Sequence, residues 1–406
     1  MARSKTMIFF SQLRRTPSTN QSATLVPPTR ITRSRRKAVA GDKRLQKKLA
    51  LLLPGHNEEL IIASTIRSAI AAGQSKHDIY VVSDGSTDNT HSVATALLGE
   101  SHVLSVEHSG KAGAIKKALE HFDIVSQYRW VHVADADSIF GSNYFRIYRR
   151  KLNHKKYAVA VGFVQSLRGN WISTYRAATY AYSQHVNRRV QSKFNMISVF
   201  PGPITCFRTD ILKDLDFEAN SLTEDFDITL QVHRKKLGKV LFIPQAVNYT
   251  QDPQTYRDFC KQNFRWQRGF FQGVKKHRIG TKLQPIDISL NIQMLQAVLY
   301  LLQMFILMPY LIITNHNWMY LPVALTADFI LTGTITLASS VVIKRWNLFG
   351  TMPYFYLLRW TEIAIFVTAF VEVMILKRFQ VVAHGWSTAG RRYQVSAEAL
   401  KDVAGA

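Results

Sequence analysis

Residues 49–72, LALLLPGHNEELIIASTIRSAIAA, and residues 78–98, DIYVVSDGSTDNTHSVATALL, decide the fold. Each segment begins with a short apolar run, passes through a turn rich in Gly, Asn, Asp and Ser, and continues with apolar residues at helical spacing. A short apolar run bounded by turn residues is typical of a strand that is buried on both faces. The two segments therefore predict strand–turn–helix units of an α/β protein.

The same pattern continues to about residue 250. The predicted strands are 49–54, 78–84, 101–106, 129–134, 157–163 and 239–247. The predicted helices are 58–72, 87–98, 111–122, 143–152 and 172–193. This alternation predicts a mostly parallel sheet covered on both faces. Because such sheets bind ligands at the carboxyl ends of their strands, we expect the chemistry just after residues 54, 84 and 134.

Positive charge is concentrated at the start of the chain. The 406 residues carry a net charge of +25, and residues 1–48 hold 13 Lys or Arg against Asp42 alone. This basic arm lacks apolar periodicity and is predicted to be disordered. It is either a solvated tail, a product of a misplaced start codon, or a cytoplasmic arm held by anionic lipid at about 1 kcal/mol per basic residue. Two cysteines, Cys206 and Cys260, exclude a disulfide framework.

Three apolar segments follow the α/β region. Residues 292–313 contain no charge, 320–343 contain Asp328, and 354–376 contain three charged residues. A span of about 20 apolar residues crosses a bilayer, whereas a central charge costs about 2.5–3.5 kcal/mol. We therefore expect two to three transmembrane helices within 286–380, after a catalytic domain at 49–285 and before a tail at 381–406. The alternative is that all three are core helices of a soluble protein.

Basic residues in the loops indicate the orientation of these segments. The loop 314–319 has no Lys or Arg and is expected outside, whereas Lys344 and Arg345 are expected inside. Both assignments agree with a cytoplasmic domain before the first span. A third span would place the basic residues after 376 outside, against the positive-inside rule, so whether the last segment crosses stays open.

Acidic residues stand at the ends of two predicted strands. Asp84 could accept hydrogen bonds from a base or ribose, and Gly85 permits close approach. Asp135 and Asp137 face one side of an extended chain, and paired carboxylates at this position suit Mg²⁺ or Mn²⁺ with substrate phosphates. Each motif alone is equally compatible with an ordinary turn or helix cap.

Three further motifs carry chemistry. Lys111 lies near a helix N-terminus, which suits a phosphate, although the Walker A spacing is absent. Asp225 follows Thr223 and is either a general base or one of the acids that cap a helix. The segment 262–266, QNFRW, places a glutamine, an arginine and a tryptophan on one helical face. This face could bind pyrophosphate and a sugar ring, or rest at a bilayer surface.

Taken in order, these motifs resemble the family 2 glycosyltransferases. The succession is PGHNE, DGSTD, GKAGA, DAD, FPGP, TED, QNFRW and then apolar segments, over about residues 49–376. It is most similar to the membrane-embedded processive branch, which contains cellulose, hyaluronan, chitin and poly-N-acetylglucosamine synthases. The chain differs from that branch in having a basic arm instead of a membrane span before the domain, which weakens the case for polymer translocation more than the case for glycosyl transfer.

The resemblance implies a GT-A α/β fold and a role for each motif. Asp84 and Lys111 would bind the nucleotide, Asp135 and Asp137 would hold Mg²⁺ or Mn²⁺, and Asp225 would be the catalytic base. The remaining implied site residues are Gly202, Glu224, Gln262 and Trp266 at the acceptor and Arg265 at the pyrophosphate.

The implied reaction is a single inverting displacement from a UDP-sugar, with N-acetylglucosamine or glucose favoured, onto a growing polysaccharide. A single addition to a lipid or lipid-phosphate acceptor is the alternative. The positive charge could also indicate a nucleic-acid-binding or scaffold protein. This role is disfavoured because nearly half of that charge lies in the basic arm. The expected partners are the donor, the acceptor and membrane lipids, without nucleic acid. The expected location is the cell membrane as a multi-pass protein with a cytoplasmic catalytic domain.

Overall fold

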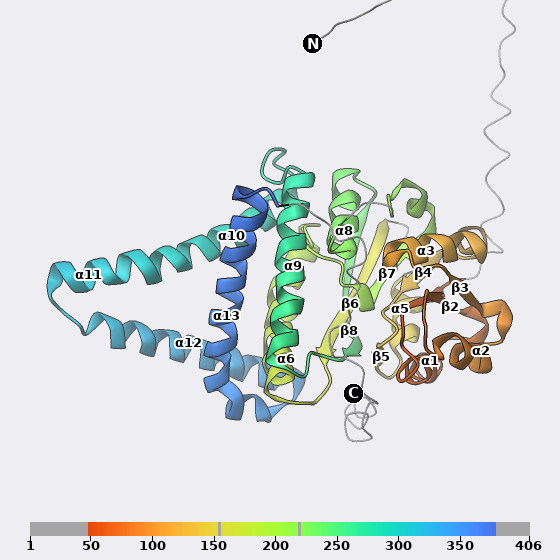
Figure 1. The fold of residues 1–406 in the computed structure, drawn as a ribbon, viewed down its shortest axis with the longest axis horizontal. Coiled ribbons are helices and arrows are strands. Elements are labelled where there is room, and N and C mark those ends of the chain that lie inside the picture. Colours follow the sequence, from red (N-terminus) through yellow and green to blue (C-terminus); the bar gives the residue numbers. More distant parts are fainter. Residues whose placement is uncertain (1–47, 153–155, 218–220, 379–406) are drawn as a thin grey trace, which may run out of the picture. The chain divides into compact units, whose positions relative to one another are not determined.

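The centre of the protein is an eight-stranded mixed sheet, seen in a computed structural model that describes residues 48–152, 156–217 and 221–378 (Figure 1). The strand order is β3-β2-β1-β4-β7-β6-β8-β5. The predictions for the basic arm, apart from its last residue Lys48, and for the tail at 381–406 lie outside the described residues.

The strands confirm all six sequence predictions to within a few residues. Their bounds are β1 Ala50–Gly55, β2 Ile79–Asp84, β3 Val103–Val106, β4 Trp130–Val133, β5 Ile139–Phe140, β6 Tyr157–Ser166, β7 Thr205–Arg208 and β8 Lys239–Thr250. Two short strands, β5 and β7, were not predicted. Both pair antiparallel with their neighbours, so the sheet is mostly but not wholly parallel.

Burial on both faces explains the continuous apolar runs. In β1, Leu51 and Leu53 pack into one hydrophobic cluster, while Ala50 and Leu52 pack into another, and all four are fully buried. Successive side chains of a strand point to opposite faces, so both faces of β1 need apolar residues.

Strand directions bring the expected loops to one edge. β1 is parallel to β2 and β4, and β6 is parallel to β8. Because β7 is antiparallel to both β4 and β6, β6 runs in the same direction as β4. The carboxyl ends of these strands therefore share an edge with the beginning of β7. The segment just before β7, which contains Gly202, is delivered to that edge by a strand that runs the opposite way.

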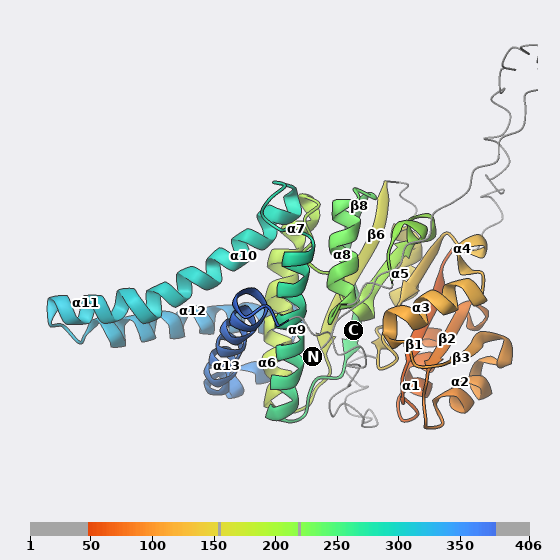
Figure 2. The ribbon, with the colours of Figure 1, turned by 45° about the horizontal axis from the view of Figure 1, so that its top comes forward.

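The described helices cover the sheet and continue beyond it (Figures 1 and 2). Their bounds are α1 Ile62–Ala71, α2 Thr90–Leu98, α3 Gly110–His121, α4 Ile124–Gln127, α5 Tyr144–Lys151, α6 Trp171–Tyr182, α7 Arg189–Lys193, α8 Glu224–Arg234, α9 Tyr256–Lys276, α10 Pro285–Leu302, α11 Met308–Asn315, α12 Tyr320–Ile343 and α13 Met352–Phe370. The predicted helix 172–193 is α6 and α7 joined by a π-helical turn, Ser183–Arg188.

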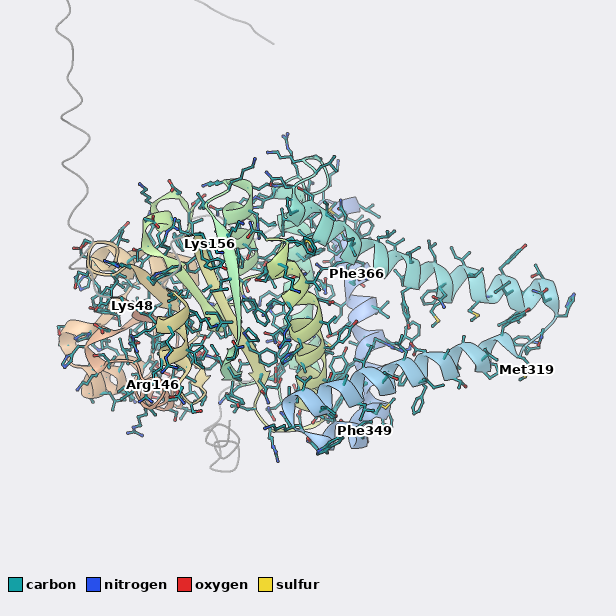
Figure 3. All side chains as sticks on the ribbon, turned by 180° about the vertical axis from the view of Figure 1, so that it is seen from behind. Lys48, Arg146, Lys156, Met319, Phe349 and Phe366 are labelled. Atoms are coloured by element: carbon teal, nitrogen blue, oxygen red, sulfur yellow. The ribbon has the colours of Figure 1, made fainter. Side chains whose placement is uncertain are left out.

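Two apolar helical segments extend away from the sheet. They are 285–315, formed by α10 and α11 through a π-helical turn, and α12, and both are long and apolar enough to cross a membrane by length and composition. Almost none of their apolar residues are buried. Figure 3 shows the exposed apolar side chains along these helices, with Met319 at the tip where they meet. Two of the three predicted segments thus have the dimensions of a span.

The third predicted segment behaves differently. α13 is absent from the described helices that meet the span criteria, and it lies along α9 (Figure 1). Ile365 and Ala369 are buried, and Phe366 and Phe370 pack on Phe271 of α9. One side of α13 is therefore part of the core around α9.

Candidate active site

A cavity of about 520 Å³ opens at the shared edge of the strands. Its lining comes from the ends of β1, β6 and β8 and the loops after β1, β4 and β8, from the segment before β7, and from helices α3, α6 with the π-helical turn after it, α8, α9 and α10. Nine of the ten predicted site residues line it: Lys111, Asp135, Asp137, Gly202, Glu224, Asp225, Gln262, Arg265 and Trp266. Segments far apart in the sequence thus form a single site.

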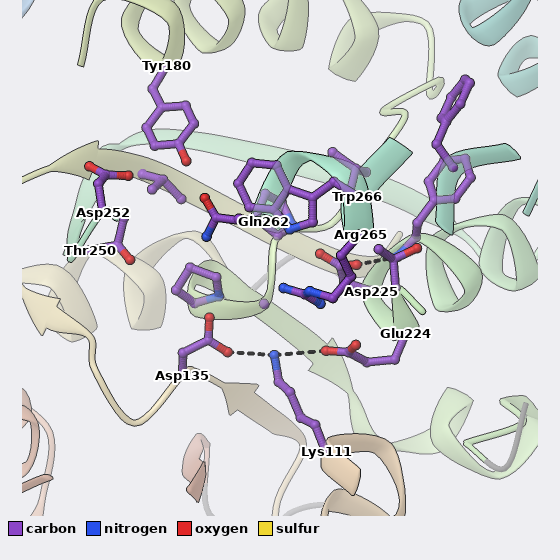
Figure 4. A pocket seen from close by; sticks show the side chains of 18 of the residues that line it. Lys111, Asp135, Tyr180, Glu224, Asp225, Thr250, Asp252, Gln262, Arg265 and Trp266 are labelled. Carbon is purple, nitrogen blue, oxygen red and sulfur yellow. Dashed lines mark hydrogen bonds and ion pairs between the residues drawn. The ribbon is translucent and has the colours of Figure 1, made fainter. Parts of the chain in front are cut away.

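Lys111 bridges two of the acidic segments (Figure 4). Its Nζ lies 2.5 Å from Oδ1 of Asp135 and 3.0 Å from Oε1 of Glu224. Burial opposes the charge of the ammonium group, but the two carboxylates outweigh that effect and raise the pKa of Lys111 above its ordinary value. The side chain therefore stays positively charged and joins α3, the loop after β4 and α8.

The adjacent acids of α8 have opposite pKa shifts. Burial and, after it, the neighbouring Glu224 carboxylate raise the pKa of Asp225, which reaches about 6. For Glu224, burial has the same raising effect, but Lys111 and Arg265 outweigh it and hold the pKa of Glu224 below its usual range. At neutral pH Glu224 is the ion-paired carboxylate, and Asp225 is ionised yet able to take up a proton. This separation is what a catalytic base requires.

Two glycines let α8 approach α9 closely. A Cβ on Gly269 would overlap the side chain of Thr223, and one on Gly273 would lie 2.5 Å from the Phe226 ring. These glycines are one helical turn apart, so they form a groove on α9 that receives the first turn of α8. The groove brings Asp225 into the cavity that Arg265 and its neighbours line.

Gly202 makes a close approach of a different kind. A Cβ there would lie 2.5 Å from Nζ of Lys111 and 2.9 Å from Oδ1 of Asp135. The backbone before β7 therefore passes directly over the Lys111–Asp135 ion pair. Any side chain at this position would displace that pair.

Asp135 and Asp137 are the candidate metal ligands. Both line the cavity, and the described residues contain no group of three or more His, Cys, Asp or Glu side chains placed to hold a metal. Two carboxylates without further protein ligands suit Mg²⁺ or Mn²⁺, which complete their coordination with water and substrate phosphates. The donor set therefore fits a metal that enters with a phosphate-bearing substrate.

The QNFRW segment lies on α9 and faces the cavity with its three predicted residues (Figure 4). Arg265 donates a hydrogen bond of 3.3 Å to the Leu222 carbonyl, just before the acids of α8. Gln262 accepts a hydrogen bond of 3.4 Å from Arg176. Trp266 presents its ring to the same cavity, where a sugar could stack on it.

Asp84 is the one predicted site residue that does not line the cavity. It is fully buried, its Oδ1 accepts hydrogen bonds from the Ser109 backbone N–H at 2.7 Å and hydroxyl at 3.2 Å, and its Oδ2 lies 3.0 Å from Nδ1 of His108. Its carboxylate thus stabilises the turn before α3. Contact between Asp84 and a nucleotide stays a prediction.

The lining also contains residues that the sequence did not reveal. These are Tyr180, Gln184, Arg188 and Asp252, among others, whereas Glu58 belongs to the PGHNE motif. A signal existed for Asp252, an acid just after the predicted strand 239–247. No local pattern marks Gln184 and Arg188, which lie in the π-helical turn after α6.

The chain is similar to known glycosyltransferases. The model of a family described as "Glycosyltransferase like family 2" matches residues 47–269. Poly-beta-1,6-N-acetyl-D-glucosamine synthase of Staphylococcus aureus strain COL is 23% identical over 269 residues, or 65% of this chain and 64% of that protein. The enzyme of the same name from Staphylococcus epidermidis is 23% identical over 71% of each chain. The chain thus spans just under two thirds of the length of the S. aureus relatives.

Solved structures give weaker likenesses. A mannosyltransferase from Pyrobaculum calidifontis, in complex with GDP-Man and Mn²⁺, has a TM-score of 0.49 and 17% identity, covering 82% of this chain and 88% of that one. S. aureus TarS in complex with UDP-GlcNAc has a TM-score of 0.41 and 16% identity, covering 80% and 90%. The family match and the α/β sheet confirm the expected GT-A class of the domain.

The glycine groove yields a stability prediction. Gly273→Ala should lower the free energy of unfolding by roughly 1–3 kcal/mol because the added methyl meets Phe226. The measurement is the thermal midpoint in detergent. The matched control is Gly333→Ala in α12, where the nearest atom, Cε of Met352, lies 3.5 Å away. Alanine there should be neutral or stabilising, and an equal loss in both variants would contradict the groove.

Proposed function

The chain belongs to family 2 of the glycosyltransferases, and from this premise we propose that it is a membrane-bound inverting enzyme. It transfers a sugar from a UDP-sugar to the hydroxyl of a growing polysaccharide, with Asp225 as catalytic base. The observation that carries the proposal is the position of Asp225, a partly buried acid of raised pKa in the same cavity as Arg265, Asp135 and Asp137.

The chemistry assigned to Asp225 is a proton transfer. A sugar hydroxyl is a weak nucleophile, so a positioned carboxylate accelerates its attack. Asp225 takes the hydroxyl proton while the oxygen forms a bond to the anomeric carbon of the donor. The bond from that carbon to the UDP oxygen breaks, and UDP leaves with the electron pair. The product has the opposite anomeric configuration because attack and departure occur on opposite sides.

The positive groups of the cavity suit the leaving diphosphate. Arg265 offers a planar guanidinium group to the phosphate oxygens, and Lys111 supplies a fixed positive charge near the loop after β4. Mg²⁺ or Mn²⁺ held by Asp137 and Asp135 would neutralise the charge that develops on the diphosphate. Asp84 remains our candidate for the base of the nucleotide, approached from the end of β2.

The acceptor end is formed by Gly202, Glu224, Gln262 and Trp266, with the flat face of Trp266 as the platform for a sugar ring. We favour UDP-N-acetylglucosamine as donor because the named relatives make poly-β-1,6-N-acetylglucosamine, with UDP-glucose as the second choice. Two apolar helices support a membrane location. The proposal also includes a catalytic domain in the cytoplasm and two to three spans. A lipid or lipid-phosphate acceptor that receives one sugar is the alternative function.

The direct test incubates detergent-solubilised full-length protein with UDP-N-acetylglucosamine, UDP-glucose and other UDP-sugars plus Mg²⁺ or Mn²⁺. We expect UDP release with one donor, loss of that release in EDTA, and products of many sugars on chromatography. Products that carry one sugar on a lipid would favour the alternative.

Asp225→Asn should lower kcat by roughly 10²–10⁴. Asp210→Asn, which alters an exposed acid paired with Arg208, should not. Full turnover by Asp225→Asn would refute the assignment.

The raised pKa of Asp225 also predicts a pH profile. Only the deprotonated carboxylate accepts the proton, so kcat/KM should rise with pH, bend near pH 6 and level off above it. Below the bend the rate should fall about tenfold per pH unit, because the active fraction falls in that proportion. The measurement is the initial rate of UDP release between pH 5 and 8, with tryptophan fluorescence as a check on folding. A rate that stays flat down to pH 5 would contradict this role.

A further inference from the structure

Behind the cavity lies a buried guanidinium group that the proposed reaction does not use. Arg176 belongs to α6, is only 5% exposed, and does not line the cavity. Its guanidinium carbon lies 4.8 Å from the ring centre of Trp266 and 4.7 Å from that of Phe259. It thus contacts two aromatic residues of α9, one of which, Trp266, lines the cavity.

The same guanidinium group holds a second acceptor-end residue. Its Nη2 donates a hydrogen bond of 3.4 Å to the carboxamide of Gln262. Because Trp266 and Gln262 are one helical turn apart on α9, one planar cation contacts both. A desolvated cation against an aromatic face contributes up to about 2 kcal/mol, which is enough to fix the orientation of a ring.

The charge of Arg176 is balanced from another helix. Among the described residues, its ion pair is with Glu362 of α13, at 3.6 Å between Nη1 and Oε1. The other oxygen of Glu362 accepts a hydrogen bond of 2.7 Å from the Tyr175 hydroxyl. A buried charge is stable only when it is compensated. Glu362 forms the ion pair, and the carboxylate of Asp252, which lines the cavity, adds a favourable interaction with Arg176.

We propose that Arg176 is a positioning residue that orients Trp266 and Gln262 toward the acceptor, and that Glu362 anchors it from α13. Acceptor binding then depends on a carboxylate that never touches the substrate and that belongs to the C-terminal helical region. This inference rests on the proposed function and adds to it a physical link between α13 and the acceptor end of the cavity.

A second ion pair to the α13 region, made from α9 and not from α6, provides a control. Arg268 of α9 pairs with Glu372, just after α13, with a distance of 2.6 Å from its Nη2. Arg268 stacks on Phe264, not on Trp266, and its side chain is 43% exposed. If any ion pair to the α13 region sufficed, loss of either pair would have the same effect.

The experiment measures how much UDP is released per sugar incorporated by full-length protein in detergent, together with product length and the donor KM. Arg176→Met and Glu362→Gln should raise the UDP released per sugar roughly tenfold and shorten the products. The donor KM should change less than about twofold, because the donor end is untouched. Arg176→Lys, which keeps the charge but not the planar group, should restore part of the coupling. Glu372→Gln should behave as wild type.

The outcomes separate this inference from the proposed function. A wild-type protein that releases no UDP from any donor would refute the proposed function. An active wild type whose folded Arg176→Met and Glu362→Gln variants keep full coupling and product length would overturn the positioning role alone. Equal loss in Glu372→Gln would also overturn it, because the effect would then be general to the helical packing. If Arg176→Met does not fold, Glu362→Gln decides, since it keeps the size of the side chain and a partner for Tyr175.

Discussion

The ammonium group of Lys111 between Asp135 and Glu224 is the interaction on which the rest of the site depends. Six acidic side chains line one cavity, and carboxylates brought together out of water repel each other unless cations are placed among them. Lys111 holds the loop after β4 and the start of α8 together, although they lie far apart in the sequence. It also holds Glu224 as an ion-paired carboxylate, whereas burial and the negative charge of Glu224 raise the pKa of the next acid, Asp225.

Close backbone approach makes that charge arrangement possible. Gly202 passes over the Lys111–Asp135 pair, and Gly269 and Gly273 admit the first turn of α8 to the surface of α9. In each case a side chain would occupy the space that a functional group needs. The antiparallel strand β7 has a comparable role, because it is the reversed direction of β7 that places Gly202 at the carboxyl edge of the other strands.

The strands and most site residues could be predicted because their signals are local. β1, β2 and β4 are continuous apolar runs, and Asp135 and Asp137 follow one of them directly. β7 was missed because its four residues carry no distinct alternation. The hydrogen-bond partner of the Asp84 carboxylate could not be predicted, because it is the backbone N–H of Ser109, which only the tertiary structure brings to Asp84. The role of Arg176 could not be predicted for the same reason, because its partners belong to α9 and α13, which follow much later in the sequence.

The base helix is also tied to the first apolar helix, which constrains how the site meets a membrane. Arg234, near the end of α8, forms two hydrogen bonds of 2.7 Å with the carboxylate of Asp287, in the first turn of α10. Asp287 is fully buried and also accepts the backbone N–H groups of Gly280 and Gln284. The helix that carries Asp225 and the helix that begins the apolar segment are therefore held as one body. If α10 lies in a bilayer, the contact between Arg234 and Asp287 fixes the distance of the cavity from that bilayer. Arg176 and Glu362 in turn fix the orientation of Trp266, and Glu362 belongs to α13.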